Sequence, residues 1–76
     1  MTSKLQKIEK ARANLGRALV RFCSALMNLG TAGETLRVGE KSAALLLCIA
    51  LANETSDSNL RAELWHCVRW LDGGGT

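Results

Sequence analysis

The chain has 76 residues, of which ten are Lys or Arg, seven are Asp or Glu, and 47% are hydrophobic. This length allows one small domain, and the apolar fraction argues against a disordered chain. Proline and tyrosine are absent while Ala and Leu are abundant, a composition that favours helix throughout. We therefore predict one all-α domain over residues 1–76, with residues 73–76 as a flexible tail.

The net charge of +3 is unevenly distributed along the chain. Residues 1–29 carry six basic residues and one glutamate, a net of +5, which leaves −2 for the remainder. Such an asymmetry favours attraction to a polyanion or an acidic partner. It is equally compatible with attraction between the two parts of the chain.

Cysteine usage and hydropathy indicate a cytoplasmic protein. Cys23, Cys48 and Cys67 are odd in number, widely spaced and each surrounded by apolar residues, which predicts buried free thiols rather than disulfides or a metal site. The N-terminal segment lacks the apolar stretch of a secretory signal. The longest apolar run, residues 43–52, has about half of the length that a bilayer crossing requires.

The first predicted element is a long helix over about residues 3–29, capped by Thr2 or Ser3 and ended by Gly30. Apolar side chains recur in it on alternating three- and four-residue steps, the a and d positions of a heptad repeat, and only Arg12 interrupts them. This spacing is typical of a helix that packs along a coiled-coil seam. The predicted oligomer seam consists of Leu5, Ile8, Arg12, Leu15, Leu19, Phe22 and Leu26.

Small residues flank this seam on both sides. Ala11, Ala18 and Ala25 recur every seven residues on one flank, and Gly16 and Cys23 lie on the other. Small side chains allow a neighbouring helix to approach closely. Gly16 costs about 1 kcal/mol relative to alanine within a helix, and close backbone contact is one plausible reason for it.

The second predicted element is a helix over about residues 34–53, after the turn GTAG. Its first half is amphipathic, whereas its second half, AALLLCIALA, is apolar on all sides. A helix without a polar face has to be enclosed, either by the rest of the chain or by another subunit. Because one short chain has few elements to do this, we predict a homo-oligomer, with a dimer favoured.

The third predicted element is a helix over about residues 59–72, after a polar linker whose Asp57, Ser58 or Asn59 is suited to cap it. At 100° per residue one of its faces is apolar and should be buried. Trp70 lies at the edge of that face and should be half-buried. The residues predicted to converge on the buried face are Leu60, Leu64, Cys67, Val68 and Leu71.

The opposite side of this helix carries the predicted partner-binding residues Arg61, Trp65 and Arg69. Residues four apart are neighbours on a helix, so two guanidinium groups flank one indole. Tryptophan and arginine are enriched at binding hot spots. The alternatives are a surface ladder without a ligand and an indole covered by another subunit. His66 diverges from Cys67 by 100°, so a shared metal is not expected.

A second candidate surface is the basic face of the first helix, formed by Lys7, Lys10, Arg17 and Arg21. It favours nucleic-acid or nucleotide binding as the alternative function, with stacking from Trp65. Neither a helix-turn-helix signature nor an aromatic RNA-binding motif is present. The plainer interpretation is a solvated charged face.

Catalysis is not predicted. The single histidine has only Glu63 as a nearby carboxylate, and phosphate-loop and dinucleotide motifs are absent, since GEKS at residues 39–42 lacks the upstream glycine of a phosphate loop. No cofactor and no metal are expected, and a membrane partner is disfavoured by the acidic residues. The sequence therefore predicts a small non-enzymatic adaptor or inhibitor, of the kind encoded by phages or plasmids, that binds another protein as a homo-oligomer.

Overall fold

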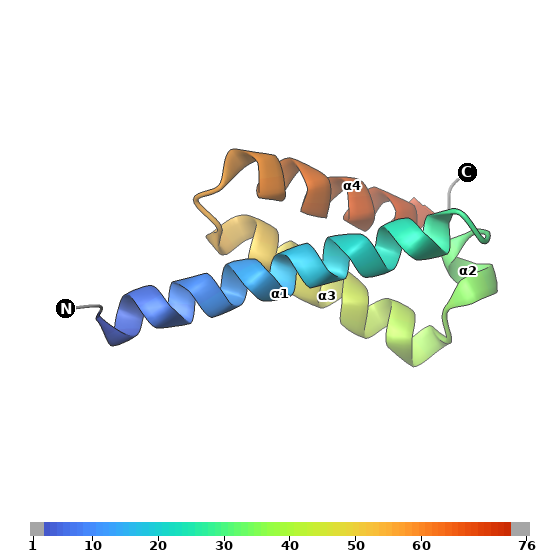
Figure 1. Cartoon of the computed structure of the whole chain (residues 1–76). Coiled ribbons are helices and arrows are strands. Elements are labelled where there is room, and N and C mark those ends of the chain that lie inside the picture. Colours follow the sequence, from blue (N-terminus) through green and yellow to red (C-terminus); the bar gives the residue numbers. More distant parts are fainter. Residues whose placement is uncertain (1–2, 74–76) are drawn as a thin grey trace.

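The computed structural model describes residues 3–73, which form helices and no strands, as the composition predicts. Its four helices are α1 (Lys4–Met27), α2 (Ala32–Thr35), α3 (Val38–Glu54) and α4 (Ser58–Gly73). The chain runs along α1, returns along α3 and runs forward again along α4, while the one-turn α2 closes one end (Figure 1). The molecule measures 46 × 22 × 18 Å along its principal axes, and the longest dimension reflects the length of α1.

The helix starts are fixed by side chains that accept hydrogen bonds from otherwise unpaired backbone N–H groups. Ser3 caps α1, because its hydroxyl accepts from the N–H of Gln6 and the Gln6 side chain accepts from the N–H of Ser3. Asp57 caps α4 by accepting from the N–H groups of Asn59 and Leu60. The predicted caps Ser3 and Asp57 are therefore confirmed, whereas Thr2 lies outside the described residues.

The predicted single helix over residues 34–53 is wrong, because two helices occupy this region. The side chains of Thr31 and Glu34 cap α2, and the Glu40 carboxylate accepts from the N–H of Arg37 to start α3. Between them Leu36 has extended backbone angles and is 9% exposed. Two competing cap signals thus break the helix, and the break turns Leu36 into the core.

The other two helix ranges are close to those predicted. Helix α1 ends at Met27, slightly before the expected residue 29, and α4 covers Ser58–Gly73. Gly73, predicted to follow the last helix, is instead its final residue. The rest of the predicted flexible tail, residues 74–76, lies outside the described residues.

The hydrophobic core lies where α3 and α4 pack against each other and against α1. The predicted inward face of α4 is confirmed for Leu60, Leu64, Cys67 and Leu71, which are at most 4% exposed. Trp70 is buried at 9% exposure rather than half-buried, because the neighbouring helices cover the edge on which it lies. Val68 is half-buried.

Helix α1 approaches α4 closely through a small residue. Gly16 is buried, and a Cβ atom placed on it would lie 3.2 Å from the Cδ2 atom of Leu60. This contact supports close approach as the role of Gly16. The surface of α1 that packs on the bundle, here called its bundle face, consists of Ala13, Gly16, Leu19, Val20, Cys23, Leu26 and Met27.

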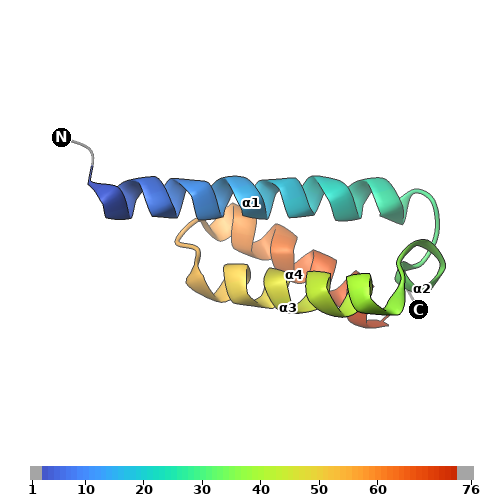
Figure 2. The ribbon, with the colours of Figure 1, turned by 90° about the horizontal axis from the view of Figure 1, so that it is seen from below.

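The N-terminal turns of α1 extend beyond the ends of α3 and α4, as both views show (Figures 1 and 2). We call residues 4–12 the arm, and all of them are exposed. A free helical segment of this length is marginal in water. The arm therefore depends on the rest of α1, or on a partner, for its helical structure.

Candidate functional site

The structure divides the predicted oligomer seam into an inward and an outward part. Leu19 and Leu26 are half-buried against the chain's own core. The other apolar members stay open to solvent, so the bundle uses only part of the seam as a packing surface. Their exposed fractions are Leu5 63%, Ile8 40%, Leu15 44% and Phe22 47%, and Arg12 is exposed as well.

The flanking alanines are exposed beside these large residues, whereas the opposite flank is not. Gly16 and Cys23 belong to the bundle face, while Ala11, Ala18 and Ala25 face solvent. The open apolar surface of α1 therefore shares Ile8, Leu15 and Phe22 with the predicted seam, and the exposed alanines form its second column. We call it the α1 stripe, and it consists of Ile8, Ala11, Leu15, Ala18, Phe22 and Ala25.

Helix α3 adds a second exposed apolar surface. The sequence requires its all-apolar half to be enclosed, yet Leu46 remains 68% exposed and Leu47 38% exposed. Leu47 lies one turn before Leu51, which lines a cleft beside α1, so Leu47 is on the side of α3 that adjoins α1. The chain by itself therefore leaves apolar surface open on both neighbouring helices.

The α1 stripe lies on the α3 side of α1. Arg17 and Arg21 line a small hollow with Asn59 and Glu63, which places these two arginines on the α4 side. The stripe occupies the opposite edge of the bundle face. Figure 2 shows α1 and α3 side by side with α4 behind them, so the α1 stripe and Leu47 border one common surface.

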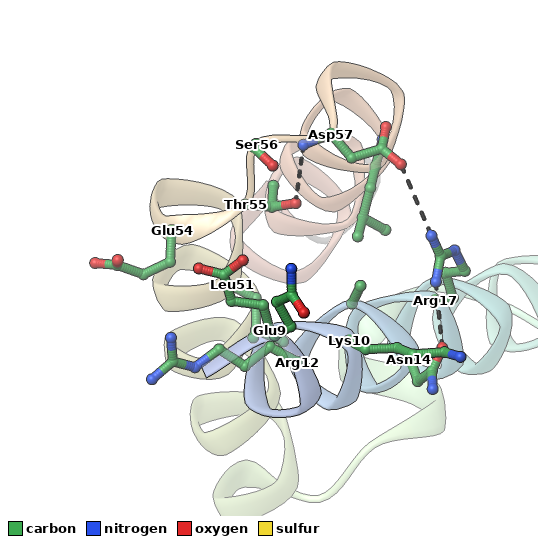
Figure 3. Close-up of a pocket in the computed structure, with 13 residues that line it drawn as sticks. Glu9, Lys10, Arg12, Asn14, Arg17, Leu51, Glu54, Thr55, Ser56 and Asp57 are labelled. Atoms are coloured by element: carbon green, nitrogen blue, oxygen red, sulfur yellow. Dashed lines mark hydrogen bonds and ion pairs between the residues drawn. The ribbon is translucent and has the colours of Figure 1, made fainter. Parts of the chain in front are cut away.

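A cleft of about 680 Å³ separates the N-terminal half of α1 from the turn between α3 and α4 (Figure 3). Its floor includes Ala13, Leu51 and Leu60. Three carboxylates and three cations line it, so the cleft has no net preference for an anion or a cation. These charged residues are Glu9, Lys10, Arg12, Arg17, Glu54 and Asp57.

The predicted basic face of α1 is exposed at all four residues, Lys7, Lys10, Arg17 and Arg21. Arg17 is partly engaged within the chain, since its guanidinium lies 3.8 Å from the Asp57 carboxylate and donates to the Asn14 side chain. Within residues 3–73 this is the one ion pair. Among the described residues, Arg17 is thus the only one of the six cations of α1 that is paired with an acidic residue from the rest of the chain.

The structure places the three predicted partner-binding residues on the outer side of α4. Trp65 is 37% exposed, and Arg61 and Arg69 are exposed. Arg61 points away from the indole, because its Nη2 atom donates to the carbonyl oxygen of Thr55, 2.6 Å away and towards the helix start. The predicted ladder of two guanidinium groups on one indole is therefore reduced to Arg69 and Trp65 as neighbours.

The three cysteines, one from each long helix, meet in the core. All three are free thiols and at most 1% exposed, and Cys23 lies close enough to Cys48 and Cys67 to influence the pKa of both. Burial disfavours the thiolate, which raises the pKa of Cys23 and raises the pKa of Cys48 to about 11 and that of Cys67 to about 12. Burial of free thiols is confirmed, and the raised pKa values make these groups poor nucleophiles at neutral pH.

Across residues 3–73 no group of three or more His, Cys, Asp or Glu side chains is arranged to hold a metal ion. His66 is exposed on α4, on the other side from the buried Cys67. Among the described helices, none combines the length and hydropathy that a membrane crossing requires.

Two of these features could not be read from the sequence. The convergence of the thiols depends on helix crossings, although the inward position of each cysteine was a partial signal. The cleft depends on how far α1 extends beyond α3, and two of its three carboxylates belong to Glu54, the last residue of α3, and Asp57, which precedes α4. Comparison with protein-family models, curated proteins and solved structures finds no significant match to this chain.

Proposed function

We propose that this chain is a small non-enzymatic, helical protein-binding module, an adaptor or inhibitor, that acts as a homo-oligomer. The observation that carries the proposal is the open apolar surface on α1 and α3. Leu15, Phe22 and Leu46 are 44%, 47% and 68% exposed. Exposed apolar side chains of this size often mark interaction sites, because leaving them in water costs free energy.

The two candidate surfaces suit two different contacts. The α1 stripe and the neighbouring flank of α3 are apolar and elongated, as expected of a helix-packing interface between subunits. Trp65 and Arg69 lie on α4, where an aromatic anchor beside a cation suits a contact with another protein. In this proposal self-association builds the assembly, and α4 presents Trp65 on its outside.

Sedimentation equilibrium over a concentration series tests the oligomer. We expect a dimer at micromolar concentration, with dissociation on dilution. A folded monomer throughout that range, with helical content confirmed by circular dichroism, would contradict it.

Co-purification from the native host tests the α4 contact. Trp65→Ala should lose a bound protein that His66→Ala, at an exposed neighbouring position on the same helix, retains. Loss with both variants, or with neither, would contradict a role for Trp65.

A second candidate is nucleic-acid or nucleotide binding by the basic face of α1. Exposure of Lys7, Lys10 and Arg21 along one side of a projecting helix favours it. The affinity for a short duplex should then fall steeply with salt, because phosphate contacts release counterions. Lys7→Gln should lower the salt slope by about one. A mobility shift that is absent even at low salt would eliminate this candidate.

A further inference from the structure

The α1 stripe alternates large and small side chains along its length. Ile8, Leu15 and Phe22 form one column, and Ala11, Ala18 and Ala25 form the other. All six are exposed, so the alternation is not a consequence of packing within the chain. Where two helices meet, large residues facing small ones fill space evenly.

We infer that the α1 stripe binds the α1 stripe of a second copy, with the two helices antiparallel and aligned along their full length. This inference rests on the proposed self-association and adds its geometry. In this register residue n of one copy lies beside residue 33 − n of the other. Each large residue then meets an alanine, and the pairs are Ile8 with Ala25, Leu15 with Ala18 and Phe22 with Ala11, each occurring twice by symmetry.

A parallel arrangement packs the same residues badly. Each residue would face its own copy, so Phe22 would meet Phe22 and Ala18 would meet Ala18. Phenylalanine layers push two helices apart, whereas alanine layers leave a gap at that separation. The antiparallel arrangement has uniform layers and therefore allows closer approach along the whole helix.

The distribution of charge along α1 also favours the antiparallel arrangement. The arm carries Lys4, Lys7, Lys10 and Arg12 against Glu9, a net of +3, whereas residues 22–29 carry no charged side chain. A parallel dimer would hold the two basic arms side by side. The antiparallel register places Lys4, Lys7 and Lys10 beside the uncharged end of the other α1 and leaves only Arg12 level with a cation, Arg21, which reduces this repulsion.

The surrounding surface also suits this occupant. A stable interface covers about 800 Å² on each partner, a substantial part of a chain whose accessible surface is 5342 Å². A helix seated on the α1 stripe lies next to α3, where it covers Leu47 as well. Each arm, exposed and projecting in the single chain, then lies along the body of the other copy.

Engineered cysteines distinguish the two orientations. Ile8→Cys and Ala25→Cys are prepared separately, and each variant is treated with a mild thiol oxidant, alone and mixed with the other after exchange of subunits. Two copies of residue 8 lie about 25 Å apart in the antiparallel register, whereas residues 8 and 25 of different copies are adjacent. The native thiols are at most 1% exposed, so the unmodified chain is the control for background crosslinking.

We expect a disulfide-linked dimer in the mixture and almost none in either variant alone. Efficient crosslinking of each variant alone would overturn the antiparallel arrangement and leave self-association standing. Absence of crosslinks in every sample, when sedimentation shows a dimer, would overturn the α1 stripe as the interface. A monomer at all concentrations would overturn both this inference and the proposed self-association.

Discussion

The inner side of α4 and the outer side of α1 are both apolar, but only one of them is closed within the chain. On α4 the large residues Leu64 and Leu71 are fully buried. On α1 the bundle face includes the small residues Ala13, Gly16 and Cys23, while the large Leu15 and Phe22 point outward. Helix α1 thus packs closely on its own bundle at these small residues and leaves Leu15 and Phe22 exposed on another surface.

The largest expected effect distinguishes buried from exposed apolar side chains by leucine truncation, at Leu64 of α4 and at Leu46 of α3. Leu64→Ala removes a fully buried side chain and should lower the free energy of unfolding by about 2–5 kcal/mol. Leu46→Ala is the matched change at a side chain that is 68% exposed, where the single chain should lose no more than about 0.5 kcal/mol. Urea denaturation at a concentration that favours the monomer measures both.

Equal losses of unfolding free energy in Leu64→Ala and Leu46→Ala would contradict the assignment of one side chain to the core and the other to an open surface. Leu46→Ala would then have to be treated as a core substitution. In the expected case it leaves the fold intact and can also be examined for weaker self-association.

A charge introduced into the α1 stripe should weaken self-association. Ala18→Glu adds a carboxylate to an exposed position of α1, so the single chain should fold normally. In the proposed dimer the carboxylate is buried without a partner, and self-association should weaken by about thirty-fold or more. Ser24→Glu is the control, since Ser24 is exposed on another side of the same helix.

Sedimentation equilibrium gives the dissociation constant of each variant, and circular dichroism confirms helix content. If Ser24→Glu weakened association as much as Ala18→Glu, general charge rather than the α1 stripe would explain the effect.

The sequence predicted the buried side of α4 well, because its periodicity continues over several turns and nothing competes with it. It predicted the α1 seam less well, since the heptad pattern identifies an apolar face but not which part of it the chain's own helices cover. Both edges of the seam carry small residues, and only the three-dimensional packing distinguishes Gly16, which is buried, from Ala18, which is exposed.

The break between α2 and α3 was missed for a different reason. Thr31 with Glu34 and Arg37 with Glu40 give two helix starts within a few residues. Helical propensity favours a continuous helix through both. The break at Leu36 places that side chain in the core, a gain that propensity does not include.

The buried thiols of the core should make the free energy of unfolding depend on pH. The folded chain raises the pKa of Cys67 from 9.0 to about 12, so it binds a proton that the unfolded chain releases at lower pH. The stability from this group is complete below pH 9.0 and is lost as the pH rises towards 12. The free energy of unfolding, measured from about pH 7 to about pH 11, should decline above pH 9.

Cys67→Ala provides the control for this measurement. The variant is less stable at neutral pH because a buried group is removed, but its stability should decline less between the same limits. An equal decline in both proteins would assign the alkaline loss to groups other than this thiol, such as Cys23 and Cys48, whose pKa values are also raised.

The smallest expected effect concerns two glycines, the buried Gly16 on the bundle face of α1 and the exposed Gly39 of α3. Gly39 has nothing within 4 Å of an added Cβ atom, so Gly39→Ala should raise the free energy of unfolding by about 0.4–1 kcal/mol through a less flexible unfolded chain. Gly16→Ala gains the same term, but its Cβ atom lies 3.2 Å from the Leu60 side chain, which has to shift. Its stabilisation, measured by urea denaturation, should therefore be smaller than at Gly39. Equal gains would mean that Leu60 yields without cost, and that α1 does not need a glycine to approach α4.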